Sequence, residues 1–268
     1  MRRFIGTILV VLICLVGLST SVQAQTPTPV PFIVPPGGIA IIGFNFDEPD
    51  QFAFVCLVNI PDKTEIRFTD NGWMSTNIFR TGESILSWYT PGGCEVGQIV
   101  NINLTDTFHR NNTTNEPFDL SPNGDQILVY QQYLTNPPTF IFALNSELTT
   151  WQTSATNANT SANPFGLDST KSIALDEIDN SIYTGPKSFN TTADALAAIV
   201  NKAIWSGSND VRQTMPSGSF SFTTTAVEVS DFRADTGGEN APWWVLVGVV
   251  VIAVVVMVVK RPKRECCK

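Results

Sequence analysis

An unbroken apolar segment at residues 243–259 constrains this chain more than any other feature of its sequence. The segment contains no charged or polar side chain. At about 1.5 Å per residue, a helix of roughly 17 residues is about 26 Å long, which is enough to cross a thin hydrocarbon core. A second apolar run, residues 4–18, lies near the N-terminus. Together the two segments predict an exported chain that a single C-terminal transmembrane helix holds in a membrane.

The N-terminal run has the features of a secretory signal peptide. Arg2 and Arg3 precede it, and Val22–Ala24 places small residues where a signal peptidase reads them. We therefore expect a signal peptide over residues 1–24. The alternative is a retained N-terminal membrane helix, which is disfavoured because the run is short and the cleavage motif is good.

The C-terminal span is predicted to have one orientation. Trp243 and Trp244 stand where an interfacial aromatic belt belongs, and the basic tail at residues 260–268 follows the span directly. The positive-inside rule places this tail in the cytoplasm and the N-terminal domain outside, a type I topology. A GPI-anchor signal is the alternative, but such signals usually end in their hydrophobic segment rather than in a basic tail.

The charge of the exported region limits its partners. Residues 25–242 contain 23 of the 24 Asp and Glu residues but only 9 of the 16 Lys and Arg residues, a formal charge of −14. A region this acidic, with no basic patch in its sequence, is not expected to bind nucleic acid. Its charge favours cations, basic partners or solubility alone.

The cysteines separate by compartment. Cys14 lies within the predicted signal peptide, so Cys56 and Cys94 are the only two in the exported region. An oxidising compartment makes them a natural disulfide pair, although a free thiol nucleophile or two buried thiols are alternatives. Cys266 and Cys267 lie next to the span on its cytoplasmic side and are predicted sites of S-palmitoylation; plain reduced thiols are the alternative.

The exported region also contains five N-glycosylation sequons, which predict surface glycans if the host is a eukaryote. The acceptor residues are Asn103, Asn111, Asn112, Asn159 and Asn190.

The region between the two apolar segments is predicted to be one β-domain. Residues 25–37 form a Pro-rich leader, residues 38–224 the domain, and residues 225–242 a short stalk. Short β-branched or aromatic runs, separated by turn-forming residues, predict an antiparallel β-sandwich. The expected strands are 39–46, 52–60, 65–69, 85–89, 99–104, 126–130, 140–143 and 219–224.

One helix is expected within the domain, over residues 193–203, because its apolar residues recur at helical spacing and Thr191 or Thr192 can cap it. Two turns are expected at Asp70–Gly72 and Asn123–Asp125, where Asn and Gly supply positive φ.

Several segments carry a family resemblance. Gly38–Asn45, Phe52–Val55, Ile66–Trp73 and Leu120–Leu128 resemble a secreted β-domain of bacterial surface proteins. The Leu-Ser-x-x-Gly-Asp turn within the last of these also resembles the lamin-tail domain, an immunoglobulin-like sandwich. The resemblance covers about residues 38–222. It implies an accessory or adhesion-type module and brings no catalytic residues with it.

Catalytic and metal-binding patterns are few. His109 is the only histidine, which excludes sites built from several histidines, and its Asn/Thr-rich surroundings favour a solvated loop residue over a catalytic one. Two acidic clusters offer oxygen ligands of the kind that Ca²⁺ takes, but neither has the spacing of an EF-hand, and solvated turn acids are the simpler interpretation. The residues concerned are Asp47, Glu48, Asp50, Asp176, Glu177 and Asp179.

The sequence thus predicts a single-pass type I membrane glycoprotein whose non-enzymatic sandwich serves adhesion or the binding of an extracellular protein, glycan or matrix. No cofactor is expected, apart from Ca²⁺ at the acidic clusters. Two other functions remain open. One is an acidic matrix protein associated with Ca²⁺ or mineral, and the other is an exported hydrolase that uses paired carboxylates.

Overall fold

The computed structural model describes residues 31–104, 118–133 and 137–223. The chain divides into two units, residues 1–223 and 224–268, and every described residue belongs to the first. No helix among the described residues is long and apolar enough to cross a membrane. The predicted signal peptide, stalk, span and cytoplasmic tail lie outside the described residues.

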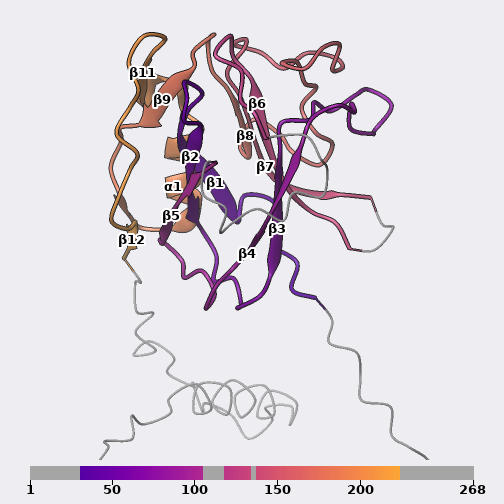
Figure 1. Cartoon of the computed structure of the whole chain (residues 1–268). Coiled ribbons are helices and arrows are strands. Elements are labelled where there is room, and N and C mark those ends of the chain that lie inside the picture. The colour runs from indigo at the N-terminus through magenta and orange to yellow at the C-terminus, as the bar shows by residue number, and fades with distance from the viewer. Residues whose placement is uncertain (1–30, 105–117, 134–136, 224–268) are drawn as a thin grey trace, which may run out of the picture. The chain divides into compact units, whose positions relative to one another are not determined.

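The domain is mainly β and consists of two five-stranded sheets packed together, with one short helix (Figure 1). The first sheet has the strand order β11-β9-β1-β2-β5, and the second has the order β4-β3-β6-β7-β8. The strands of the first sheet are β1 (Ile39–Asn45), β2 (Gln51–Cys56), β5 (Ile99–Asn103), β9 (Asn180–Tyr183) and β11 (Trp205–Ser208). Those of the second are β3 (Glu65–Thr69), β4 (Ile85–Tyr89), β6 (Gln126–Gln131), β7 (Thr139–Asn145) and β8 (Ser172–Ala174). A separate two-stranded sheet joins β10 (Ser188–Phe189) to β12 (Ser221–Phe222).

The predicted sandwich of mainly β-structure is confirmed, but its expected antiparallel pairing is wrong in two places. Strand β8 runs parallel to β7, and β12 runs parallel to β10. Parallel neighbours require a long connection that returns the chain to the same end of the sheet, and residues 146–171 provide it between β7 and β8. The other pairs within the two large sheets are antiparallel.

Aromatic side chains fill the space between the sheets. Phe52 and Phe54 of β2 alternate with residues that face away from the second sheet, so both reach Phe68 of β3. Their ring centroids lie 4.9 Å and 5.2 Å from that of Phe68, and all three side chains are buried. The alternation that the sequence shows in β2 therefore produces the main core.

The central strands β6 and β7 of the second sheet are covered on both faces, and every residue of β6 is buried. Ile127 and Val129 belong to the core between the sheets, whereas Leu128 and Tyr130 belong to a smaller cluster on the opposite face. That cluster is completed by Trp73 and other residues of the segments that follow β3 and β7. Side chains of alternating positions in one strand thus stabilise two separate apolar clusters.

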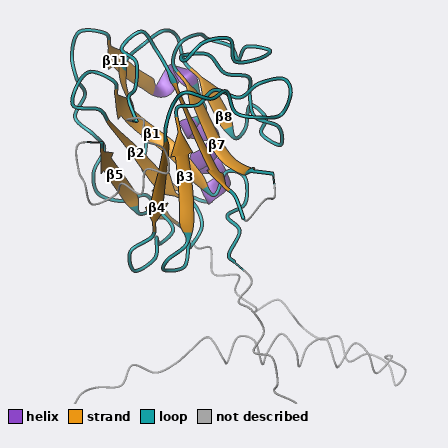
Figure 2. Cartoon of the chain, turned by 45° about the vertical axis from the view of Figure 1, so that its right-hand side comes forward, coloured by secondary structure: helices purple, strands orange, loops and turns teal. Residues whose placement is uncertain are grey.

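The helix is shorter than expected. Helix α1 spans Thr192–Ile199, begins at a capping box formed by Thr191 and Asp194, and lies against β1 (Figure 2). It is followed by the 3₁₀ helix η2 (Lys202–Ile204) and then by β11, where the sequence predicted only the end of the helix. Trp205 Nε1 donates a hydrogen bond of 2.7 Å to Ile199 O, which satisfies a carbonyl that the helix end would otherwise leave unpaired.

The predicted disulfide is confirmed. Cys56 at the end of β2 is bonded to Cys94 after β4, with a Cα–Cα distance of 6.3 Å, and both residues are buried. The bond ties the end of β2 to the connection between β4 of the second sheet and β5 of the first. Val34, in the segment predicted as the leader, is buried in the core and donates its N–H to Gln131 Oε1 at 2.7 Å.

Candidate functional site

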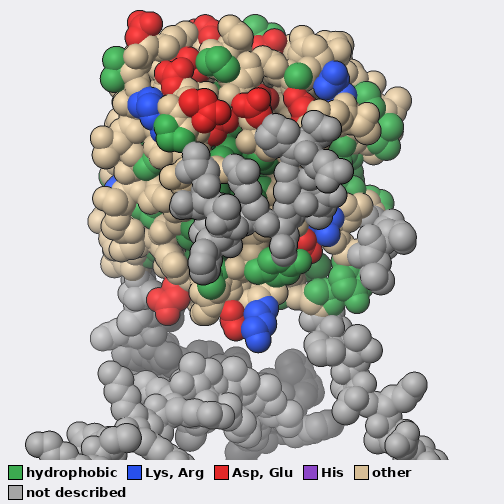
Figure 3. Space-filling view, viewed as in Figure 1, with side chains coloured by type: hydrophobic (Ala, Val, Ile, Leu, Met, Phe, Trp, Pro, Cys, Tyr) green, Lys and Arg blue, Asp and Glu red, His purple; other side chains and the backbone are tan. Residues whose placement is uncertain are grey.

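Carboxylates gather where three segments meet at one end of the sandwich. The β1–β2 turn lies beside the β8–β9 turn, since Phe46 N donates to Asp179 O at 2.7 Å. The same turn is held to the segment before β6 by Leu120 N, which donates to Asp50 Oδ2 at 2.7 Å. Figure 3 shows acidic side chains concentrated toward the upper end of the molecule in the view of Figure 1. We call this region the acidic end, and its carboxylates are those of Asp47, Glu48, Asp50, Asp70, Glu83, Asp119, Asp125, Glu177 and Asp179.

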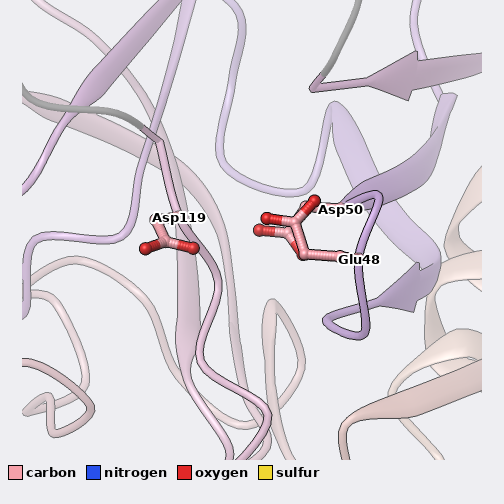
Figure 4. A group of neighbouring side chains, drawn as sticks. All are labelled: Glu48, Asp50 and Asp119. Atoms are coloured by element: carbon pink, nitrogen blue, oxygen red, sulfur yellow. The ribbon is translucent and has the colours of Figure 1, made fainter.

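Three of these carboxylates form a compact group. Glu48, Asp50 and Asp119 each offer one carboxylate oxygen, and these oxygens all lie within 4.8 Å of one another. Figure 4 shows the carboxylates of Glu48 and Asp50 side by side, across from Asp119. We call this group the carboxylate trio. Glu48 and Asp119 are exposed and Asp50 is buried, so the trio has an inner member and two outer ones.

Asp50, the buried member, is hydrogen-bonded to two neighbouring chain segments. Its main-chain oxygen accepts a hydrogen bond of 2.9 Å from Leu104 N, and its Oδ2 accepts the one from Leu120 N. Its side chain is turned inward at the start of β2, where only 3% of the residue remains exposed. Its Oδ1 is buried and has no hydrogen-bond partner among the described residues.

This environment raises the pKa of Asp50 to about 7. Burial is the main cause, since it removes water from the charged form, and the hydrogen bond from Leu120 opposes it. The negative charges of Glu48 and Asp119 raise the pKa further, whereas the positive charge of Arg212 lowers it. Asp50 is therefore a carboxylate whose charge the surrounding protein compensates only in part.

A second group of carboxyls lines a hollow of about 380 Å³ next to the trio. Asp70 follows β3, Glu83 precedes β4 and Asp125 precedes β6, so the ends of three adjacent strands bring them together. Asp70 accepts hydrogen bonds from Ser84 N at 2.9 Å and from Asp119 N at 3.3 Å. Asp119 thus touches both groups, through its backbone and through its side chain.

Burial also raises the pKa values of this second group. The pKa of Asp70 rises to about 7 and that of Glu83 to about 8; in each case burial is the largest cause, and the charge of Asp70 adds to the shift of Glu83. The pKa of the fully enclosed Asp125 is raised well above its ordinary range for the same reason. Asp125 accepts N–H groups from Ser121 at 2.9 Å and from Gln126 at 2.7 Å. Asp70 and Asp125 therefore serve to hold the backbone of the adjoining loops.

The remaining acids of the two predicted Ca²⁺ clusters lie outside the trio. Asp47 Oδ2 accepts a hydrogen bond of 2.8 Å from Asn180 Nδ2, and Glu177 Oε2 accepts one of 3.0 Å from Asn209 Nδ2. Burial raises the pKa of Asp179, and the charges of the neighbouring acids raise it further. Asp176 is exposed.

Only Glu48 and Asp50 of the six predicted ligands thus come together in one three-carboxylate group, and the third member, Asp119, was not predicted. No local pattern marks Asp119, because it follows Asp50 by many residues and approaches it only through the fold.

The other residues singled out from the sequence are the glycosylation acceptors, the single histidine and the two C-terminal cysteines. Asn190 is exposed after β10, and Asn103 ends β5. Asn159 is half-buried, and its Nδ2 donates to Ser121 Oγ at 2.7 Å. The residues that lie outside the described part of the chain are Asn111, Asn112, His109, Cys266 and Cys267.

A larger hollow of about 500 Å³ lies away from the acidic end, beside the start of β3 and the end of β6. Its lining includes the exposed apolar residues Phe32, Ile33 and Tyr133. At the acidic end, a hollow is lined by carboxyls whose pKa values burial and neighbouring charges raise, a combination that marks a candidate functional site, so we take the acidic end as the candidate.

No family model, curated protein or solved structure matches this chain, and its function must therefore be argued from its own residues.

Proposed function

We propose that this chain is a single-pass type I membrane glycoprotein that displays its β-sandwich at the cell surface, where the domain binds a protein, glycan or matrix partner without catalysing a reaction. The observation that carries this proposal is the disulfide between Cys56 and Cys94. Structural disulfides form and persist in oxidising compartments. Because both cysteines are buried within the core, the bond belongs to the folded domain and supports folding on the exported side.

The form of the domain also supports a binding role. Two packed sheets provide a rigid frame, and loops at the ends of such a frame are the usual place for binding contacts. The acidic end brings several such loops together, and acidic side chains are concentrated there (Figure 3). Kinship with the lamin-tail domain agrees with the two packed sheets and stays a prediction.

Proximity labelling on intact cells tests this proposal. A peroxidase inserted at the exposed Gly166, which has no neighbouring atom within 4 Å of its Cβ position, should leave the fold intact. With a membrane-impermeant substrate, we expect labelled surface and matrix proteins. Labelling that requires permeabilised cells, or that marks cytosolic proteins, would refute surface display.

A hydrolase is the second candidate, and one observation favours it. Glu83 borders the hollow of about 380 Å³ and has a pKa of about 8, a value suited to a general acid near neutral pH. Its Oε2 is buried without a hydrogen bond among the described residues. If the chain is a hydrolase, purified protein should cleave members of a glycoside and ester panel, and Glu83→Gln should lose most of that activity. Equal rates in both proteins would exclude this role for Glu83.

A further inference from the structure

We infer that Glu48, Asp50 and Asp119 form a Ca²⁺-binding site at the acidic end. Ca²⁺ binds oxygen ligands at about 2.3–2.6 Å, so two oxygens on opposite sides of one ion lie at most about 5 Å apart. The carboxylate oxygens of the trio, within 4.8 Å of one another, fit this limit. The inference goes beyond the proposed function and stands or falls independently of where the chain is displayed.

The orphaned oxygen of Asp50 provides a second, independent observation. Asp50 is 3% exposed, and its Oδ1 has no hydrogen-bond partner among the described residues. A buried carboxylate oxygen without a partner is costly, because burial removes its water and nothing replaces it. A cation held between Asp50 and the two outer carboxylates would supply the missing partner.

The protein's own positive charge does not take this place. Arg212 is near enough to Asp50 to influence its pKa. However, the ion pairs within 4.0 Å among the described residues all involve acids outside the trio. These pairs are Arg67–Glu65, Arg80–Glu83 and Lys171–Asp168. Arg212 Nη1 itself is buried without a hydrogen-bond partner in the same part of the chain. Among the described residues, no ion pair within 4.0 Å therefore neutralises the trio.

The number of carboxylates favours Ca²⁺ over Mg²⁺. Mg²⁺ gives up its water reluctantly and is usually held by only one or two carboxylates, whereas Ca²⁺ takes six to eight oxygen ligands. The trio offers three carboxylates to one ion, which fits Ca²⁺ better. The group contains only carboxylates, which are the hard ligands that Ca²⁺ prefers.

The ion would have a structural consequence. Glu48 and Asp50 belong to the β1–β2 turn, and Asp119 belongs to the segment before β6, so the ion would link the two sheets at this end. Because Glu48 and Asp119 are exposed, water can complete the coordination of the ion on its outer side. With only three protein ligands, we expect weak binding, with a dissociation constant of about 10⁻⁴–10⁻³ M.

Calorimetric titration of Ca²⁺ into the full-length chain, purified in detergent, tests the site. We expect saturable binding that Asp119→Asn weakens at least tenfold, together with a Ca²⁺-dependent rise in melting temperature that this variant loses. Asp176→Asn is the matched control, because it removes the same charge from an exposed acid outside the trio. It should leave both measurements unchanged. MgCl₂ at equal concentration should give a smaller rise in the unaltered chain.

The experiment does not depend on the buried Asp50. Asp119 is exposed, so its conversion to Asn should preserve the fold, and an unchanged melting temperature in EGTA verifies this. Glu48→Gln provides a second exposed variant with the same expected loss. The inference is wrong if the unaltered chain binds no Ca²⁺ at a concentration about tenfold above the expected dissociation constant. It is also wrong if Asp176→Asn weakens binding as much as Asp119→Asn does, since diffuse surface charge would then explain the binding.

Discussion

The replacement Glu83→Gln is expected to stabilise the domain at alkaline pH and to leave it unchanged in acid. Glu83 is only 13% exposed, its Oε2 is buried without a hydrogen bond among the described residues, and its nearest cation is Arg80 at 3.8 Å. Burial and the charge of Asp70 raise its pKa from 4.5 to about 8. Between these two values the unfolded chain has lost the proton that the folded chain retains, so the stability of the folded state falls as the pH rises.

The size of the effect follows from the shift. A change from 4.5 to about 8 corresponds to about 5 kcal/mol if all of it reaches the free energy of unfolding, at about 1.4 kcal/mol per pKa unit. Solvent and Arg80 screen part of this cost, so we expect Glu83→Gln to be more stable than the unaltered chain by about 2–3 kcal/mol at pH 9. At pH 4 both side chains are neutral, and the two proteins should agree within about 0.5 kcal/mol.

Urea unfolding of the full-length chain in detergent, followed by tryptophan fluorescence at pH 4, 7 and 9, measures this difference. Glu95→Gln is the control, because it makes the same chemical change at an exposed position and should follow the unaltered chain at each pH. Parallel pH profiles for Glu83→Gln and the unaltered chain would refute the account of a buried, charge-penalised Glu83.

Three further changes test the frame of the fold. Replacing both Cys56 and Cys94 by Ser should lower the free energy of unfolding by about 4 kcal/mol, because the bond closes a loop with a sequence separation of 38; urea unfolding measures the loss. Phe68→Ala should cost about 3–5 kcal/mol in the same assay, since its ring fills the space between the sheets. Gly124→Ala should lower the melting temperature more than Gly166→Ala. Both glycines have positive φ, but only at Gly124 would a Cβ meet backbone, at 2.7 Å from Glu147 Cα.

The longer strands could be predicted from sequence because local pattern and tertiary contacts agree. Strands β3, β4 and β5 begin where β-branched or aromatic runs begin, and turn residues separate them. The short strands β8, β9 and β11 were missed. The segment Trp205–Ser208 has little intrinsic preference for β-structure. It forms a strand because it pairs with β9. The helix was predicted too long, because Asn201 caps a new turn by accepting a hydrogen bond from Ala203 N.

Of the two turns predicted from local sequence, one was right and one was wrong. Gly124 has a φ of +86°, as the Asn-Gly-Asp pattern predicted. Gly72 is not among the residues with positive φ, so the predicted role of the Asp70–Gly72 turn was wrong. Glycine is needed there for another reason, since a Cβ would overlap the main-chain oxygen of Thr160. A requirement set by a segment this distant in sequence leaves no local signal.

The candidate site could be predicted in part. Glu48 and Asp50 are neighbours in sequence, and this clustering identified them as possible ligands. Asp119 and the raised pKa values of Asp70 and Glu83 depend on segments that only the fold brings together. Burial of a carboxylate is a tertiary property, and the alternation of apolar residues cannot reveal it.

Cysteine accessibility in intact cells tests the central claim, surface display on a single span, most directly. A membrane-impermeant maleimide should label Asp176→Cys without permeabilisation, because this position is exposed on the folded domain. The unaltered chain should remain unlabelled from outside, since Cys56 and Cys94 are bonded to each other. Cys266 and Cys267 should react only after permeabilisation and thioester cleavage. Labelling of Cys266 and Cys267 from outside, or of position 176 only in permeabilised cells, would contradict the account.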